Sequence, residues 1–142
     1  LSPGFVKKFT FVPEENFNKL KTANFILAVG QGVASKQAVQ DLEKVAEIPN
    51  AQIVVSRPVA MHAWAPLDHM VGISGMITNP ELCLTVGVSG AAAFMAGIEK
   101  SRFIISINSD AQAPIIKRSD VAVIADYQAF IDALLKVLQI PQ

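Results

Sequence analysis

The sequence contains a single cysteine, Cys83, among its 142 residues, and no apolar run approaches the ~20 residues that span a bilayer. A lone cysteine excludes an internal disulfide and fits a reducing compartment. Twelve basic residues balance twelve acidic ones. Because neither sign of charge predominates, the composition indicates neither nucleic acid nor a membrane surface as a partner, and we expect no insertion into a membrane.

The usual catalytic and metal-binding groupings are also missing. The sequence shows no Ser/His/Asp set and no cysteine pair, and the two histidines, His62 and His69, flank Trp64 and Pro66 without further ligands nearby. This favours packing roles for both histidines, and we predict neither catalytic residues nor a metal site. The chain opens with Leu-Ser-Pro-Gly and lacks the pattern of a secretory signal. We expect it to be a piece of a longer polypeptide.

The apolar fraction, in contrast, is large: 51% of the residues are hydrophobic and only 17% are charged. This excess indicates a sheet buried on both faces, or a surface that meets another domain. Apolar strand-like runs alternate with helix-like stretches, which is typical of a parallel sheet covered by helices. We therefore predict an α/β fold, a three-layer Rossmann-like parallel sheet with helices on both faces.

The predicted domain covers residues 25–142, and residues 1–24 are expected to form an N-terminal strand, around 7–13, and a connecting segment. Further strands are expected at 25–29, 52–55, 82–88, 102–107 and 121–125. Helices are expected at 35–47 with Ser35 as its cap, at 90–99, and at 127–138 with Phe130, Ile131, Leu134, Leu135 and Leu138 facing inward. Residues 56–69 are expected to be irregular, and residues 70–78 are weakly strand-like.

Small polar residues follow the predicted strands. Ligands of parallel sheets bind beyond the carboxyl ends of the strands, so these residues are candidates for a site. Glycines, hydroxyls and amides suit holding a nucleotide better than breaking a bond. The candidates are Gly30-Gln31-Gly32, Ser56-Arg57, Ser89-Gly90, Asn108-Ser109-Asp110 and Asp126.

The stretch Gly87-Val88-Ser89-Gly90-Ala91 has two interpretations. In one, a glycine lets the backbone approach a ligand, and a serine caps a helix whose free N–H groups favour a phosphate. In the other, the same residues form an ordinary tight turn from strand to helix. The residue types leave both open. Gly30-Gln31-Gly32 lacks the third glycine of the dinucleotide fingerprint and favours an ordinary turn.

Two ungapped blocks of the chain resemble the C-terminal, FAD-binding domain of the electron transfer flavoprotein alpha subunit. Residues 86–126, VGVSGAAAFMAGIEKSRFIISINSDAQAPIIKRSDVAVIAD, match its Val-Gly-Ile-Ser-Gly turn and its later Asn-x-Asp and Ala-Pro-Ile motifs. Residues 56–75, SRPVAMHAWAPLDHMVGISG, match its Ser-Arg segment that leads to Val-Gly-Gln-Thr-Gly. The similarity covers about residues 28–137.

The resemblance implies an extended FAD on a Rossmann-like sheet, in an electron carrier without substrate chemistry of its own. Electrons would pass between flavin dehydrogenases and a downstream acceptor. The expected partner is an electron transfer flavoprotein beta subunit, in a heterodimer with AMP on that subunit. The expected compartment is the cytoplasm in a bacterium and the mitochondrial matrix in a eukaryote.

The same resemblance assigns roles to individual residues. Arg57 would lie against the flavin ring and favour its reduced forms, because a fixed cation raises the reduction potential of a ring that gains negative charge. Ser74 would bond the ring near its reactive nitrogen. Ser89, Gly90 and Ala91 would hold the chain or the phosphates, Asn108 the middle of the cofactor, and Asp126 with Tyr127 the adenosine end. The full predicted cofactor-binding set is Gln31, Ser56, Arg57, Gly72, Ser74, Gly75, Ser89, Gly90, Ala91, Phe94, Asn108, Asp110, Asp126 and Tyr127.

The chain departs from the family pattern at four positions. Gln31 replaces an arginine, Ile73 a glutamine, Met76 a lysine, and Phe94 the histidine that would bond a flavin carbonyl. Each lost polar contact costs about 1–3 kcal/mol of binding. An alternative function is therefore a degenerate, non-redox nucleotide-binding or scaffold module on the same fold. A third possibility, a nucleotide-dependent hydrolase or sirtuin-like deacylase, has no catalytic histidine or metal cluster to support it.

Overall fold

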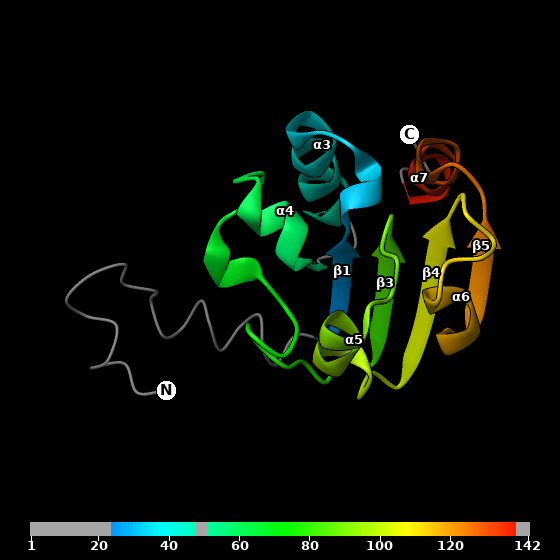
Figure 1. Ribbon diagram of the computed structural model, residues 1–142. Helices are drawn as coiled ribbons and strands as arrows, with labels where there is room; N and C mark the ends of the chain where they lie inside the picture. The colour runs from blue at the N-terminus through cyan, green and yellow to red at the C-terminus, as the bar shows by residue number, and fades with distance from the viewer. Residues whose placement is uncertain (1–23, 48–50, 139–142) are drawn as a thin grey trace.

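In the computed structural model, residues 24–47 and 51–138 are described. Five strands form one parallel sheet in the order β2-β1-β3-β4-β5 (Figure 1). They are β1 (Phe25–Val29), β2 (Gln52–Val55), β3 (Leu82–Val86), β4 (Phe103–Asn108) and β5 (Val121–Ile124). All five strands predicted within the domain are confirmed, with small differences at their ends. The strand expected around residues 7–13 lies outside the described residues.

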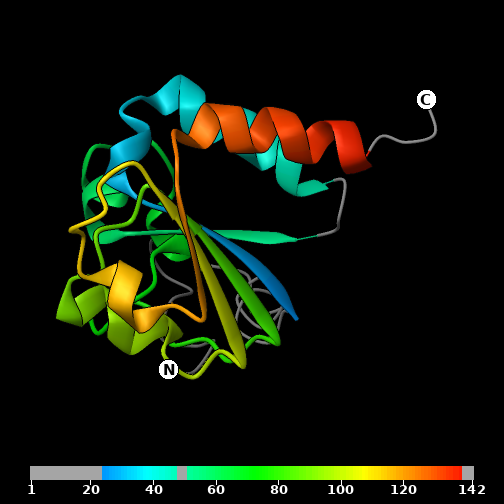
Figure 2. The same cartoon turned by 90° about the vertical axis from the view of Figure 1, so that its right-hand side faces the viewer.

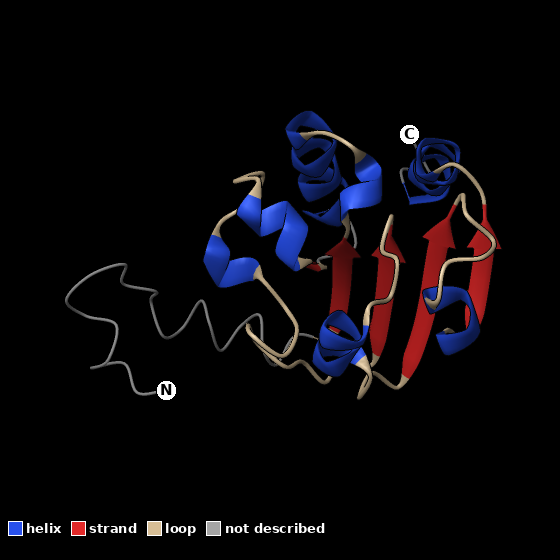
Figure 3. Ribbon diagram, viewed as in Figure 1, coloured by secondary structure: helices blue, strands red, loops and turns tan. Residues whose placement is uncertain are grey.

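Helices cover both faces of this sheet. Figures 1 and 2 show α3, α4 and α7 on one face and α5 and α6 on the other, and Figure 3 shows the resulting helix–sheet–helix layering. The predicted three-layer α/β fold is therefore confirmed. None of the described helices is long and apolar enough to cross a membrane. The helices are α3 (Lys36–Glu47), α4 (Arg57–Met61), α5 (Ala92–Ile98), α6 (Ile115–Arg118) and α7 (Tyr127–Leu138), with two single 3-10 turns, η1 (Gln31–Val33) and η2 (Leu67–His69).

Alternate residues of the strands β1 to β4 enter two separate cores. In β1, Leu27 and Val29 join the core that includes residues of α3 and α4, whereas Ile26 and Ala28 join the core that includes residues of α5 and α6. All four side chains are at most 2% exposed. Because both faces of β1 to β4 are buried, these strands are mostly apolar in sequence rather than alternating, whereas β5 at the edge is largely exposed.

Two of the predictions for the connecting segments are wrong, and one short helix was not predicted. Residues 56–69 are not irregular throughout, because they contain α4 and η2. Pro58 stands in the first turn of α4, where the N–H that proline lacks would have no partner in the helix. Residues 70–78 form no strand but two isolated bridges, Val55 with Met70 and Val71 with Met76. The short helix α6 was not predicted, since four residues are too few to show a periodic pattern.

The starts of α3 and α5 differ in how they are capped. Ser35 caps α3 as predicted, because its Oγ accepts a hydrogen bond from the N–H of Ala38 at 3.1 Å. The predicted cap of α5 is wrong: α5 begins at Ala92, its N-cap is Ala91, and no side chain caps it. Ser89 therefore precedes the helix, and it is exposed between the buried residues Val88 and Gly90.

The closing helix α7 has the predicted bounds. Phe130 packs against the core on the α3 and α4 side, as expected. The side chains of the other four residues expected to face inward are not among those described: Ile131, Leu134, Leu135 and Leu138.

Cys83 provides a test of the core. Burial raises the pKa of its thiol from 9.0 to about 12, since the charged thiolate is disfavoured away from water. We expect a thiol reagent to leave Cys83 unmodified in the native protein at neutral pH and to modify it fully in urea. Because the unfolded thiol loses its proton first, the stability that Cys83 contributes should be complete below pH 9.0 and should fall as the pH rises toward 12.

Urea denaturation at several alkaline pH values, compared with Cys83→Ala, isolates this contribution from that of other titrating groups. Rapid modification of the thiol in the native protein would contradict the burial of Cys83.

Candidate functional site

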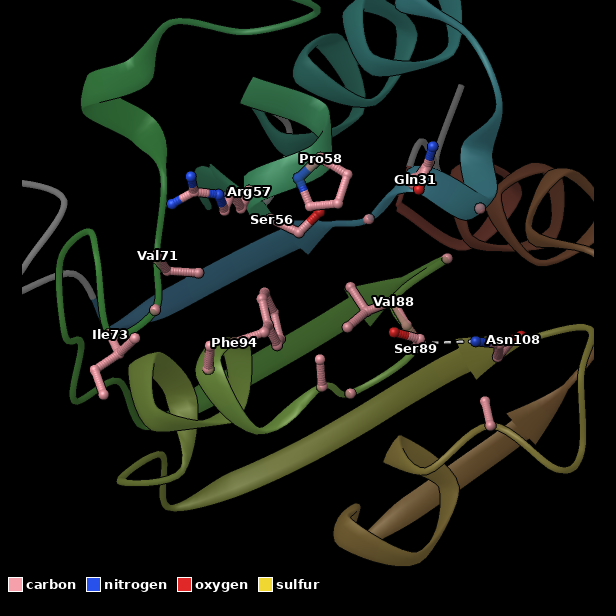
Figure 4. Close-up of a pocket in the computed structure, with 18 of the residues that line it drawn as sticks. Gln31, Ser56, Arg57, Pro58, Val71, Ile73, Val88, Ser89, Phe94 and Asn108 are labelled. Atoms are coloured by element: carbon pink, nitrogen blue, oxygen red, sulfur yellow. Dashed lines mark hydrogen bonds between the residues drawn. The ribbon is translucent and has the colours of Figure 1, made fainter. Parts of the chain in front are cut away.

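The direction of the chain across the sheet reverses at β1. The chain runs from β1 outward to β2 and then crosses back over β1 to β3, β4 and β5. In parallel sheets, ligands bind at the carboxyl ends of the two strands between which the direction reverses, here β1 and β3. A cavity of about 530 Å³ opens at this edge (Figure 4). Small-molecule sites are typically cavities of roughly 300–1,000 Å³.

Segments that follow four neighbouring strands form the cavity wall. All the predicted site residues line it except Gly75, Asp126 and Tyr127. The structure thus brings together residues that lie up to 83 positions apart, from Gly30 to Ala113. The complete lining is Gly30, Gln31, Gly32, Ser56, Arg57, Pro58, Val71, Gly72, Ile73, Ser74, Gly87, Val88, Ser89, Gly90, Ala91, Ala93, Phe94, Asn108, Asp110 and Ala113.

Bare backbone at the ends of β1 and β3 forms one part of this wall. The N–H of Gly30 donates to the carbonyl of Val86 at 2.8 Å, and the N–H of Gly32 donates to the carbonyl of Gly87 at 2.9 Å. A Cβ at Gly30 would lie 2.4 Å from the carbonyl oxygen of Gly87, closer than any side chain allows. Glycine is therefore required here for the packing of the two strand ends, which agrees with the interpretation of Gly30-Gln31-Gly32 as a turn.

The segment 89–94 contributes free backbone donors. None of its six N–H groups donates a hydrogen bond to an acceptor among the described residues. Five of these residues line the cavity: Ser89, Gly90, Ala91, Ala93 and Phe94. Gly90 turns the chain with a φ of +93°, a conformation that side chains disfavour. Unpartnered amides at a cavity wall are available to an anionic or carbonyl-bearing ligand.

Arg57 is the one cation among the lining residues. It is the first residue of α4 and lines the cavity (Figure 4), and its guanidinium donates to Ser74 Oγ at 3.3 Å. This contact joins α4 to the loop that carries Ser74. Since Arg57 is exposed, its field is partly screened by solvent.

Ser56 carries a buried hydroxyl without a partner. The residue is 7% exposed, and its Oγ makes no hydrogen bond with any described residue. It is the N-cap of α4, yet its side chain does not bond the helix. A buried hydroxyl in a cavity wall gains a hydrogen bond when a polar ligand atom reaches it.

Asn108 and Asp110, in contrast, use their side chains to hold the protein's own backbone. The Asn108 amide donates to the carbonyl of Val88 at 2.8 Å (Figure 4), and its oxygen accepts from the N–H of Asp110 at 2.8 Å. The Asp110 carboxylate accepts from the N–H of Gln112 at 2.9 Å. Both residues line the cavity, but their described hydrogen bonds fix the loops after β3 and β4.

The three predicted residues outside the lining have contacts of their own. Gly75 turns the loop, and a Cβ there would lie 2.3 Å from the carbonyl oxygen of Met70. Asp126 accepts from the N–H of Gln128 at 3.4 Å at the start of α7. Desolvation and, to a lesser degree, the carboxylates of Asp126 and Asp41 raise the pKa of Tyr127. Asp126 and Tyr127 follow β5, so they lie at the same edge of the sheet as the cavity.

The lining residues outside the predicted cofactor-binding set are glycine, aliphatic or proline, although Gly30 and Gly32 were among the candidates for a site. They are Gly30, Gly32, Pro58, Val71, Ile73, Gly87, Val88, Ala93 and Ala113. Val71 and Val88 are only 2% and 3% exposed, so in sequence they cannot be told from core residues. Their positions in the sequence could have identified these lining residues, because most of them adjoin a predicted site residue.

The positions that depart from the family pattern have different environments. Gln31 lies at the cavity with its amide nitrogen 3.2 Å from His62 Nε2, and His62 stacks on Trp64 with ring centroids 5.0 Å apart. Phe94 is buried in the core on the α5 side and also lines the cavity. Ile73 lines the cavity and is 72% exposed, whereas Met76 is buried outside the lining.

Comparison with known proteins shows which family this sequence matches. The family model described as "Electron transfer flavoprotein FAD-binding domain" matches residues 19–99. The chain is 38% identical over 116 residues to the Escherichia coli K12 protein named "Putative electron transfer flavoprotein subunit YgcQ", covering 82% of this chain and 40% of that protein. It is 35% identical over 113 residues to the electron transfer flavoprotein subunit alpha of Clostridium acetobutylicum, covering 80% and 34%.

A third relative, the protein FixB of Escherichia coli O139:H28, is 34% identical over 126 residues, covering 88% of this chain and 40% of FixB. The chain thus spans between 34% and 40% of the length of these relatives. Among solved structures, a "putative phosphosugar isomerase" of Silicibacter pomeroyi is 15% identical and covers 70% of this chain and 30% of its own. Its TM-score of 0.39 is too low to support an inference about fold or function. The family model and the curated relatives place this chain in the electron transfer flavoprotein alpha family, within its FAD-binding domain.

Proposed function

We propose that this chain binds FAD in the cavity at the carboxyl ends of β1 to β4, as part of an electron transfer flavoprotein. The run of amides at residues 89–94, which have no acceptor among the described residues and border the cavity, carries this proposal. FAD, when bound, supplies reversible electron transfer. The donors fit such a ligand, because amides, the Ser56 hydroxyl and the Arg57 guanidinium all suit phosphate and carbonyl oxygens.

The chain's own residues would bind and tune the cofactor. Arg57 stabilises negative charge that builds up at the cavity mouth, and its hydrogen bond to Ser74 orients the guanidinium. Ser56 offers its free hydroxyl from the wall. The amides of residues 89–91 hold the phosphates or the chain, and Asn108 keeps that segment in place through the carbonyl of Val88. We assign the adenosine end to Asp126 and Tyr127.

We infer that the complete protein pairs with an electron transfer flavoprotein beta subunit that holds AMP, and exchanges electrons with flavin dehydrogenases. The names of the relatives support an electron transfer role, and the exposed apolar residues Phe103, Val121 and Ile124 on the β4 and β5 side of the sheet support contact with a further domain or subunit. Such a complex would work in the cytoplasm of a bacterium or in the mitochondrial matrix of a eukaryote.

The direct test is FAD binding by the purified protein. We expect an oxidised-flavin absorption band, or saturable binding of added FAD in isothermal titration, and release of intact FAD on denaturation, identified by mass spectrometry. A protein that unfolds cooperatively but neither carries nor binds FAD would contradict the proposal. The alternative function, a degenerate, non-redox nucleotide-binding or scaffold module, would then be favoured. Titration with AMP and ADP would distinguish a nucleotide-binding module from a scaffold.

The free hydroxyl of Ser56 gives a sharper test. We expect Ser56→Ala to weaken FAD binding about 5- to 30-fold, the equivalent of about 1–2 kcal/mol for one hydrogen bond, while leaving the stability of the apoprotein unchanged or slightly raised. The matched control is Ser106→Ala, because Ser106 is also buried with an unpartnered Oγ but lies outside the cavity lining. Equal affinities in titrations of Ser56→Ala and Ser106→Ala would remove Ser56 from the site.

Arg57 should act on the potential more than on affinity. Removing its charge in Arg57→Ala should lower the two-electron midpoint potential of bound flavin by roughly 20–45 mV, which corresponds to a contribution of about 1–2 kcal/mol from the exposed cation to the reduced state. Arg102→Ala is the control, since it removes the same charge from the opposite edge of the sheet, just before β4. Redox titration giving the same midpoint for the wild type and Arg57→Ala would exclude the proposed role.

A further inference from the structure

Gly97 of α5 lies outside the cavity but contacts the loop that carries part of its wall. This loop, residues 70–78, supplies Val71, Gly72, Ile73 and Ser74 to the lining. At its start, the N–H of Val71 donates to the carbonyl of Val55 in β2 at 3.0 Å. The rest of the loop has no such contact with β2, so its position depends on what fastens it elsewhere.

Two carbonyls of α5 fasten the loop. The carbonyl of Ala93 accepts from the N–H of Ile73 at 2.8 Å. The carbonyl of Gly97 accepts both from the N–H of Thr78 at 2.9 Å and from its hydroxyl at 2.8 Å. Thr78 is 0% exposed, so these bonds are shielded from water. Residues 93 and 97 are four apart and share one face of the helix. The loop is therefore hydrogen-bonded along that face.

Between these two anchors, the backbones of helix and loop are in direct contact. A Cβ at Gly97 would lie 2.4 Å from the nitrogen and 2.8 Å from the Cα of Gly72. A Cβ at Gly72 would in turn lie 2.8 Å from the carbonyl oxygen of Ala93, and Gly72 has a φ of +129°. Because the opposing atoms are backbone, a methyl group at position 97 must push the loop away by about 1 Å to reach ordinary contact distance.

We propose that Gly97 is a positioning residue of the flavin site, which sets the place of the loop that faces the ring. Ser74 is two residues from Gly72 and accepts the hydrogen bond of Arg57 at 3.3 Å. Any displacement of Gly72 therefore reaches the Arg57–Ser74 pair, although Gly97 itself is not in the lining. This inference rests on the proposed function, that the cavity binds FAD.

The test is Gly97→Ala, measured by FAD titration, by the visible spectrum of bound flavin, and by hydrogen exchange of the Ile73 and Thr78 amides. We expect at least tenfold weaker FAD binding, a shifted flavin spectrum, and faster exchange at both amides. Alanine favours a helix more than glycine does, so a weaker α5 cannot account for these effects. The control is the neighbouring Ala96→Gly, which weakens α5 without adding an atom at the loop and should keep the wild-type spectrum and exchange.

If Gly97→Ala fails to fold, Thr78→Val tests the same contact more mildly. It removes the hydroxyl bond to Gly97 at nearly constant shape, and we expect about threefold to tenfold weaker FAD binding with faster exchange at Thr78. Wild-type affinity, spectrum and exchange in a folded Gly97→Ala, or equal losses in Ala96→Gly, would overturn the inference while FAD binding by the wild type stands. If the wild type itself binds no FAD, the proposed function fails, and unchanged amide exchange in Gly97→Ala would then show that Gly97 does not position the loop either.

Discussion

The close backbone contact between the carboxyl ends of β1 and β3 is the constraint on which the rest of this structure depends. The N–H groups of Gly30 and Gly32 reach the carbonyls of Val86 and Gly87 at 2.8 and 2.9 Å, and a side chain at either glycine would collide with Gly87. Here the chain reverses its direction across the sheet, so the segments after β1 and β3 diverge and leave a cavity between them. The loops after β2 and β4 complete it.

Within that cavity, the polar groups divide into those the protein uses itself and those it leaves free. Asn108 and Asp110 bond the backbone of neighbouring loops. The Ser56 hydroxyl and the amides of residues 89–94 have no partner among the described residues. The free groups are donors, and the only cation in the lining is Arg57. Hydrogen-bond donors of this kind are suited to an electron-rich ligand such as the FAD proposed above.

Much of this could be predicted from the sequence. The strands were recognisable because burial on both faces makes them continuously apolar, and most of the polar site residues were recognisable because parallel strands bring their carboxyl ends to one edge. The prediction failed where a signal has two meanings. Residues 56–69, which include Pro58, were expected to be irregular although Pro58 stands at a helix start, and Val71 and Val88 look like core residues although they also line the cavity.

The sequence by itself determined the order and type of the main elements, the family, and the set of candidate residues, since these depend on local pattern and on motifs. Only the tertiary structure decided which candidates are free to bind. Whether a polar group is satisfied depends on partners distant in sequence, as with Asn108 and Val88. The contact of Gly72 with Gly97 is likewise set by the packing of a loop on a helix, and no local pattern encodes such a distance.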